Sequence, residues 1–260
     1  MNLKIYKIDA FSDKVFGGNP AAVVPLKEWI SDELMQKIAA ENNLAETAFY
    51  IPEGDKFHIR WFTPAVEVDL CGHATLATAY TLFHYENYSK NLIEFNSKSG
   101  ILTVEKQGDL LELDFPTDNL QVTETPQALI DGLGITPKET LKGISDYLLI
   151  LENEAQVKAL KPDFRKIGEV PCRGIIVTAK GDEVDFVSRF FGPQAGIDED
   201  PVTGSAHTTL TAYWAKALQK NTLSARQISP RGGNLACQLI GDRVKIAGKA
   251  TPYLIGEISV

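Results

Sequence analysis

The sequence has few of the features that mark disulfide-rich or metal-binding proteins. Only three of its 260 residues are cysteine, and Cys71, Cys172 and Cys237 lie far apart. An odd number of distant cysteines favours reduced thiols over a disulfide framework. There is no C-x-x-C motif, and the four histidines include no pair at i and i+4. The sequence therefore predicts no metal site.

Long apolar runs and excess positive charge are also absent. No apolar stretch approaches the roughly 18 to 20 residues that span a bilayer. The net charge is −8, and the 26 basic residues are spread along the chain, which disfavours a nucleic-acid partner. Neither G-x-G-x-x-G nor G-x-x-x-x-G-K-[ST] occurs, so no nucleotide cofactor is expected. We expect a soluble cytoplasmic protein whose chemistry uses side chains alone.

Alternating and helical patterns predict a mixture of strands and helices. Ser31, which precedes two acidic residues, is the predicted N-cap of a helix that runs to about Asn43. Small and apolar residues from Gly72 to about Tyr85 predict a central helix that strands approach closely. A further helix is predicted near 126–133, and strands are predicted near 3–10, 45–51, 57–63, 92–97, 101–106, 110–115, 146–151 and 174–179.

Two related stretches indicate an internal duplication. R-W-F-T-P (60–64) resembles R-F-F-G-P (189–193), and each is followed by an acidic loop, a glycine and a helix of small residues that ends in A-Y. A fainter pair, G-G-N-P-A and G-G-N-L-A, begins at residues 17 and 232. The repeats predict two similar lobes, 1–115 and 116–260, with terminal strands that can cross over between them.

The starts of the two repeated helices are candidate parts of an active site. A helix N-terminus offers unpaired N–H groups and partial positive charge to a bound anion. Gly72 and Gly204 allow backbone amides to approach a ligand, and His73 and Ser205 follow them directly. We expect the two helix starts to form opposite walls of one site that binds a small acid.

Each candidate residue also has a structural interpretation. His73 can be a structural hydrogen-bonding residue, Ser205 a helix cap and Asp200 a turn residue. Cys71 can be an acidified thiol at a helix start or a small buried apolar residue. Glu46 is flanked by small and apolar residues, where burial would make it a strong base, although most glutamates are exposed.

Four stretches together resemble the PhzF family, which comprises the isomerase of phenazine biosynthesis and its relatives. They are D-A-F-S-D-K-V-F-G-G-N-P-A-A-V-V (9–24), N-L-A-E-T-A-F (43–49), R-W-F-T-P-A-V-E-V-D-L-C-G-H-A-T-L-A (60–77) and G-I-D-E-D-P-V-T-G-S-A (196–206). The resemblance implies an α+β fold like that of diaminopimelate epimerase. In that fold two pseudo-symmetric lobes each wrap a curved mixed sheet or barrel around a central helix. It also implies a homodimer.

The resemblance assigns roles to residues of this chain. The catalytic glutamate of the family falls on Glu46, which would take a proton from a substrate C–H group and return one elsewhere. The family's histidine and aspartate fall on His73 and Asp200, which would bind substrate and assist proton movement. Substrate contacts fall on Gly72, Gly204 and Ser205, and loop character adds Asn19. In PhzF itself the substrate is trans-2,3-dihydro-3-hydroxyanthranilate, and the isomerisation needs no cofactor.

Three functions remain open at this point. Diaminopimelate epimerase uses two cysteines, but here Cys71 matches the first and Pro201 falls at the second, which favours a single-base isomerase of a small carboxylate. The second function is a serine-type hydrolase that uses Ser205, although G-S-A-H does not match G-x-S-x-G. The third is a non-catalytic protein that binds a small acid.

Overall fold

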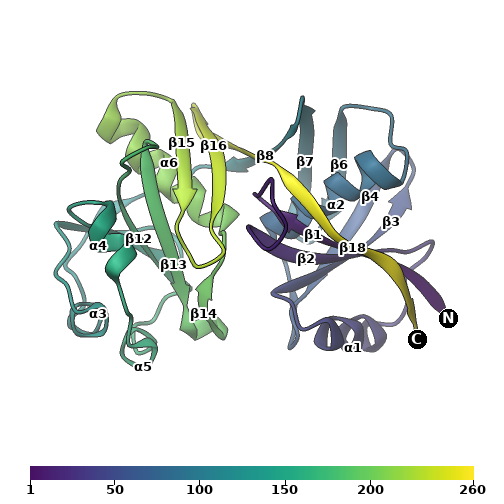
Figure 1. The fold of residues 1–260 in the computed structure, drawn as a ribbon, viewed down its shortest axis with the longest axis horizontal. Helices are drawn as coiled ribbons and strands as arrows, with labels where there is room; N and C mark the ends of the chain where they lie inside the picture. The colour runs from purple at the N-terminus through teal and green to yellow at the C-terminus, as the bar shows by residue number, and fades with distance from the viewer. The chain divides into compact units, whose positions relative to one another are not determined.

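The computed structural model describes all residues 1–260, which form two compact units (Figure 1). Unit 1 contains Met1–Asp114 and Ala247–Val260, and unit 2 contains Phe115–Ile246. The C-terminal strand β18 (Ala250–Ser259) pairs antiparallel with β1 (Asn2–Ala10), so both ends of the chain lie in unit 1. No helix of the structure is long and apolar enough to cross a membrane.

Unit 1 is built from strands around one long helix. Besides β1 and β18, its strands are β2 (Asn19–Pro25), β3 (Glu46–Glu53), β4 (Lys56–Phe62), β5 (Glu67–Val68), β6 (Leu92–Ser97), β7 (Gly100–Gln107) and β8 (Leu110–Pro116), the last of which ends at the boundary of the unit. Its helices are α1 (Asp32–Asn42) and α2 (Gly72–Tyr85). Helix α2 contacts β1, β2, β3, β7 and β18, so it is central to the unit, as the sequence predicts.

The composition of α2 explains its central position. Alanine, threonine and leucine fill most of the helix, and small side chains let strands approach on several sides. Buried hydroxyl groups need partners. Thr75, Thr78 and Thr81 each donate to the carbonyl oxygen four residues earlier, at 2.6–3.0 Å. The helix can therefore be buried although it contains polar residues.

Helix α1 covers an apolar cluster on the sheet of unit 1. Ser31 accepts a hydrogen bond from the backbone N–H of Leu34, and Asn43 ends the helix in the left-handed conformation. Met35 and Ile38 are buried against Phe49 and other residues of the cluster. The predicted cap and helix end are therefore those of the structure.

Unit 2 also surrounds one long helix with strands. Its strands are β9 (Gln121–Val122), β10 (Glu139–Lys142), β11 (Asp146–Ile150), β12 (Gly174–Lys180), β13 (Phe186–Gly192), β14 (Ile197–Asp200), β15 (Thr222–Gln227) and β16 (Gly233–Ile240), and β17 (Arg243–Gly248) ends at its boundary. Its helices are α3 (Gln127–Leu133), α4 (Glu154–Ala159), α5 (Phe164–Ile167), α6 (Gly204–Leu218) and the 3₁₀ turn η1 (Pro193–Ala195). Helix α6 contacts β11, β15 and β16.

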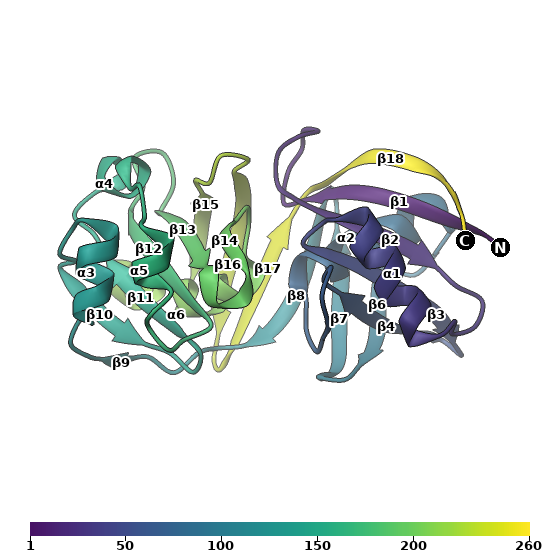
Figure 2. The same cartoon turned by 90° about the horizontal axis from the view of Figure 1, so that it is seen from below.

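The same order of strand pairing occurs in both units. In unit 1, β2 pairs parallel with β3, β3 antiparallel with β4, β4 parallel with β6 and β6 antiparallel with β7. In unit 2, β11, β12, β13, β15 and β16 repeat these four pairings in this order and direction. Each long helix follows a short strand, β5 or β14. The structure is thus a pseudo-symmetric α+β fold, and Figure 2 shows the helix and strands of each unit from below.

The repeated arginines make equivalent ion pairs. Arg60 binds both carboxylate oxygens of Glu67 through Nε and Nη2, at 2.7 and 2.9 Å. Arg189 binds Glu199 in the same way, at 2.7 and 2.8 Å. Such two-point pairs hold the planar guanidinium in a defined orientation. The arginine and acidic loop that recur in the sequence therefore connect the last long strand to the short strand before each helix.

Candidate active site

Unit 1 brings Glu46 and His73 into direct contact. Glu46 is the first residue of β3, His73 is the second residue of α2, and the two elements pack together. Oε2 of Glu46 lies 3.2 Å from Nε2 of His73, and their side chains are only 14% and 7% exposed. A carboxylate and an imidazole at hydrogen-bond distance and shielded from water can exchange a proton.

The other ring nitrogen of His73 faces Asn19. The side-chain amide nitrogen of Asn19 lies 3.3 Å from Nδ1 of His73, and both residues are buried. An amide NH₂ group only donates hydrogen bonds, so Nδ1 is the acceptor and the ring proton is on Nε2. The Nε2–H group then lies on the side of the ring that faces Glu46, 3.2 Å from Oε2 but without the geometry of a hydrogen bond. Asn19, predicted as a substrate contact, therefore lies where it selects the tautomer of His73.

A tight turn brings Asn19 to this position. Gly18 precedes it with φ +64°, and a Cβ atom there would lie 2.1 Å from the carbonyl oxygen of Ala10. Only glycine adopts this conformation without strain in so little space. The G-G-N motif thus sets the start of β2 opposite the start of α2, which packs against it.

Burial keeps the ring of His73 uncharged. Its removal from water lowers the pKa of His73 from 6.5 to about 3. At neutral pH the ring of His73 is therefore uncharged, and its contact of 3.2 Å with Glu46 is not an ion pair. The ring of His73 thus brings no charge to this contact.

Cys71 also contacts the ring of His73. Its Sγ atom lies 3.5 Å from Nδ1, and Cys71 is the N-cap residue of α2 without a side-chain capping bond. Ligand atoms of Glu46, Cys71 and His73 all lie within 4.8 Å of one another. However, Cys71 faces Nδ1 and Glu46 faces Nε2, so one ring nitrogen does not serve both. The arrangement therefore does not fit a three-ligand metal site.

In unit 2, Asp200 belongs to a buried polar network at the start of α6. Thr203 donates through Oγ1 to Oδ2 of Asp200 at 2.5 Å. Gln227 donates through Nε2 to the carbonyl oxygen of Asp200 at 2.7 Å and accepts from the backbone N–H of Thr203 at 2.9 Å. The network fixes the loop that leads into Gly204, the first residue of α6.

Ser205 contacts an arginine that the sequence did not indicate. Nη1 of Arg173 donates to Oγ of Ser205 at 2.8 Å. Nε and Nη2 of Arg173 donate to both carboxylate oxygens of Asp146, which is buried. Arg173 precedes the predicted strand 174–179 in P-C-R-G, and a basic residue directly before a buried strand was the only available signal. The guanidinium of Arg173 thus adds N–H donors to the backbone N–H groups at the start of α6.

His207 has a structural role in α6. Its Nδ1–H group donates to the carbonyl oxygen of Thr203 at 2.8 Å, one turn earlier in the helix. Burial lowers the pKa of His207 to about 4. The side chain that contacts the Ser205 hydroxyl is not His207 but Arg173. Arg173 cannot act as a base because it stays protonated.

The structure groups the predicted site residues by unit. Glu46, His73 and Asn19 lie together at the start of α2, which begins at Gly72. Asp200 and Ser205 lie at the start of α6, which begins at Gly204. In unit 1, residues far apart in the sequence therefore converge on the beginning of the central helix, whereas Asp200 and Ser205 of unit 2 are close in the sequence.

Known proteins of similar sequence cover the whole chain. A family model described as phenazine biosynthesis-like protein, PhzC-PhzF, matches residues 8–256. An uncharacterized isomerase of Pseudomonas aeruginosa is 50% identical over 258 residues, which are 99% of this chain and 99% of that protein. Both units thus have counterparts in the relatives.

Solved structures show the same fold. A phenazine biosynthesis protein of the PhzF family from Enterococcus faecalis has a TM-score of 0.98 and 46% identity over 100% of both chains. A hydroxyproline epimerase from Agrobacterium vitis has a TM-score of 0.64 at 11% identity, over 99% of this chain and 92% of that one. At such low identity the second likeness concerns the fold alone. The predicted epimerase-like α+β fold is confirmed.

Proposed function

Because this chain belongs to the PhzC-PhzF family of phenazine biosynthesis-like proteins, we propose that it is a cofactor-independent isomerase. The substrate is a small molecule that bears a carboxylate, and the reaction moves one proton within it. Glu46 is the base. The observation that carries the proposal is the contact of 3.2 Å between the Glu46 carboxylate and Nε2 of His73.

The proposed reaction has two proton steps. The carboxylate of Glu46 takes a proton from a substrate C–H group, and the C–H bonding electrons shift into the conjugated system of the substrate. The resulting carboxylic acid then returns a proton to another atom of the same molecule, so no oxidant, reductant or water is consumed. We expect the Nε2–H group of His73, which lies 3.2 Å from the carboxylate, to donate to it when substrate is bound, and Asn19 to hold His73 in that tautomer.

The remaining site residues are proposed to bind the substrate. Backbone N–H groups at Gly72 and Gly204 belong to helix starts, where a substrate carboxylate is favoured. Ser205, beside Arg173, offers a hydroxyl group, and Asp200 offers a carboxylate that suits an amine or hydroxyl group. These roles predict losses in substrate affinity when the side chains are removed.

Two alternatives have less support. A hydrolase would need a base next to Ser205, whose partner is the guanidinium of Arg173. A non-catalytic acid-binding protein would have no use for a carboxylate held next to a neutral imidazole in a shielded place. An isomerase uses both features.

Proton NMR in D₂O tests the proposal. We expect wild-type protein to convert trans-2,3-dihydro-3-hydroxyanthranilate and to introduce deuterium into the product. Glu46→Gln keeps the shape but removes the base, and should lower kcat at least about 100-fold. Glu41→Gln, an exposed change of the same type in α1, is the control and should react at the wild-type rate.

Three results of this experiment contradict parts of the proposal. Equal rates for wild type and Glu46→Gln would remove Glu46 as the base. Tight binding of the substrate without any exchange would favour a binding protein. Exchange with other small carboxylates but not with this compound would reject the substrate and leave the proton chemistry in place.

We also propose a homodimer formed through β18. This strand pairs with β1 on one edge and exposes apolar side chains, with Tyr253 54% and Ile255 58% exposed. Phe16 packs on Tyr253 at 5.6 Å between ring centroids and extends the apolar surface. An exposed apolar edge strand pairs readily with a second copy of itself, and antiparallel pairing has the required two-fold symmetry.

Light scattering tests this assembly. Ile255→Lys places a charge in the proposed interface and should halve the measured mass at micromolar concentration. Ile101→Lys is the matched control, because Ile101 is equally exposed, at 58%, on β7. A monomeric wild type, or a dimer that Ile255→Lys leaves intact, would contradict the proposed interface.

A further inference from the structure

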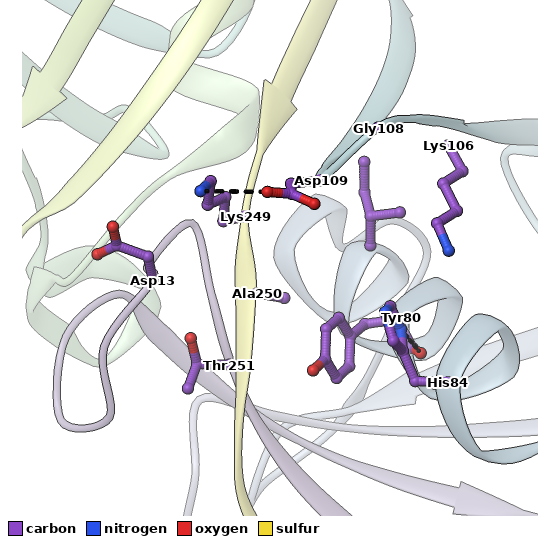
Figure 3. Close-up of a pocket in the computed structure, with 10 residues that line it drawn as sticks. Asp13, Tyr80, His84, Lys106, Gly108, Asp109, Lys249, Ala250 and Thr251 are labelled. Atoms are coloured by element: carbon purple, nitrogen blue, oxygen red, sulfur yellow. Dashed lines mark hydrogen bonds and ion pairs between the residues drawn. The ribbon is translucent and has the colours of Figure 1, made fainter.

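Charged side chains line a cavity of about 300 Å³ in unit 1 (Figure 3). Two of them form an ion pair, in which Nζ of Lys249 lies 3.7 Å from Oδ2 of Asp109, and the two side chains are 46% and 87% exposed. An ion pair that is so exposed does little to fix either side chain. Arg173 of unit 2 differs from these residues, because the carboxylate that holds it is buried.

The guanidinium of Arg173 is held in one orientation. Its Nε and Nη2 atoms donate to the two carboxylate oxygens of Asp146, whose side chain is only 2% exposed. The guanidinium also lies over the ring of Phe190, 5.5 Å from the ring centroid. Two-point pairing and the ring contact both fix the plane of the group. In this orientation its Nη1 atom lies 2.8 Å from Oγ of Ser205.

Arg173 can only donate hydrogen bonds. Burial by itself would lower the pKa of Arg173, but the hydrogen bonds and charge of Asp146 and the charges of Asp200 and Asp118 raise it above its ordinary value. A protonated guanidinium has five N–H donors and no acceptor. Oγ of Ser205 therefore accepts the hydrogen bond from Nη1, and the hydrogen of the Ser205 hydroxyl group points elsewhere.

Other hydroxyl groups of the two central helices donate to the backbone of their own helix. Thr78 and Thr81 donate to carbonyl oxygens four residues earlier, at 2.8 and 3.0 Å, and Thr208 donates to the carbonyl oxygen of Ser205 at 2.8 Å. Such local bonds are common for short polar side chains in helices. The hydroxyl group of half-buried Ser205 instead has Arg173 as its partner. Its hydrogen thus remains available to a molecule bound at the start of α6.

The ion pair between Arg173 and Asp146 also has a structural interpretation. Asp146 begins β11 and pairs with Gly174, the first residue of β12, so the ion pair joins the starts of two neighbouring strands. Buried ion pairs are, however, weak sources of stability, and apolar residues of similar volume often serve as well. An apolar pair would not fix a guanidinium that reaches a third element, α6.

We propose that Arg173 is a positioning residue for ligand binding in unit 2. Held by Asp146, it keeps the hydroxyl group of Ser205 turned so that the hydroxyl hydrogen donates to an oxygen of the bound molecule. This role rests on the proposed function, in which Ser205 binds the substrate. An ammonium group has only donors and cannot accept this hydrogen. The position therefore selects a carboxylate oxygen over an amine.

A binding titration of the full chain, which needs no turnover, tests this role. The probe is benzoate, and ¹H–¹⁵N NMR follows the amide signals of Gly204 and Ala206, which flank Ser205. We expect saturable shifts with the wild-type protein, and about tenfold weaker binding for Ser205→Ala and for Arg173→Gln. The double variant should also bind about tenfold more weakly, and not about 100-fold, because both changes remove the same contact.

Arg173→Lys separates positioning from structural support. The variant keeps a positive charge beside Asp146, so its melting temperature should stay within about 4 °C of that of the wild type. A single ammonium group lacks the planar fork that pairs with Asp146 and reaches Ser205 at once, so benzoate should still bind about tenfold more weakly. Arg165→Gln, a change of an exposed arginine in α5, is the control and should bind benzoate like the wild type.

Three results would overturn the proposed role of Arg173. They are the absence of saturable shifts with wild-type protein, an additive loss of about 100-fold in the double variant, and wild-type binding by Arg173→Lys. The fate of the isomerase proposal is separate. If the coupled losses are found but no deuterium exchange occurs, the isomerase fails and the role of Arg173 stands. If exchange occurs but Arg173→Gln binds benzoate like the wild type, the reverse holds.

Discussion

The two units share their architecture but differ at the position of the proposed base. In unit 1, Glu46 lies three residues before Phe49, which pairs with Arg60. In unit 2, Gly174 lies three residues before Val177, which pairs with Arg189. By register, Gly174 is therefore the equivalent of Glu46.

The environment of Gly174 excludes an acid there. A Cβ atom at this position would lie 2.1 Å from Cζ of Phe190. The neighbouring Arg173 instead presents a guanidinium to Ser205 and is held by Asp146. At the same place in the fold, one unit thus has a carboxylate beside an imidazole, and the other has a cation beside a hydroxyl group. A symmetric two-base mechanism would need a second carboxylate at this position, where the chain has Gly174.

The two helices also place their histidines differently. His207 is the fourth residue of α6, and the fourth residue of α2 is Thr75. Both donate to the carbonyl oxygen of the cap residue, Thr203 or Cys71, at 2.8 and 2.6 Å. His207 and Thr75 therefore have the same structural role. The residue of α6 at the position of His73 is Ser205, not a histidine.

The largest expected effect concerns the two arginine pairs. Glu199→Gln should lower the free energy of unfolding by about 3 kcal/mol, because the charge of Arg189 then keeps only carbonyl partners in a largely buried place. Glu67→Gln should cost only about 1 kcal/mol, because Arg60 retains the exposed carboxylate of Asp32 at 2.8 Å. Urea unfolding of both variants measures the difference, and equal costs would contradict this account.

Replacing the histidine of each helix by threonine should distinguish a residue that affects the reaction rate from one that affects only stability. His73→Thr should lower kcat about 100-fold, equivalent to about 2.7 kcal/mol, because Glu46 loses its donor. His207→Thr should leave kcat within about threefold while costing about 2 kcal/mol of stability through the cavity it creates. Steady-state rates at pH 7 and thermal unfolding give both values. A large rate loss in His207→Thr would place that residue in the reaction.

A methyl group at the equivalent of Glu46 should strain unit 2. Gly174→Ala should lower the free energy of unfolding by about 2 kcal/mol, because Phe190 must move to make room. Gly256→Ala is the control, since its nearest neighbour would be 3.6 Å away and no positive φ is involved. Denaturant unfolding compares the two. A neutral Gly174→Ala would show that the ring of Phe190 yields easily and that an acid is tolerated there.

The smallest effect for each unit of the measured variable is a slope of stability with pH. The pKa of His207 is lowered from 6.5 to about 4 by burial, so between these values the unfolded chain binds a proton that the folded chain does not. Stability therefore falls as pH decreases from 6.5 to about 4, by up to about 1.4 kcal/mol per pH unit. His207→Thr should lose stability less steeply over this window. Identical slopes in urea unfolding would contradict the assignment.

Several elements could be predicted because their signals are local. The cap at Ser31, the end of α1 at Asn43 and the bounds of α2 follow from residues within one or two turns. In unit 2, α4, α5, β15 and β16 were not predicted, because short segments carry weak periodic patterns. The repeats nevertheless indicated the duplicated architecture, which the shared pairing order confirms.

The sequence alone determined the central helices, the identity of Glu46 and His73 as the acid–base candidates, and the family. Only the tertiary structure decided that Asn19, 54 residues before His73, selects its tautomer, and that Asp146 and Arg173 support Ser205. The physical reason is that helix caps and turns depend on neighbours in the chain, whereas these contacts depend on strand register and on how segments far apart pack. The sequence shows which side chains are present, but it does not show which of them contact each other.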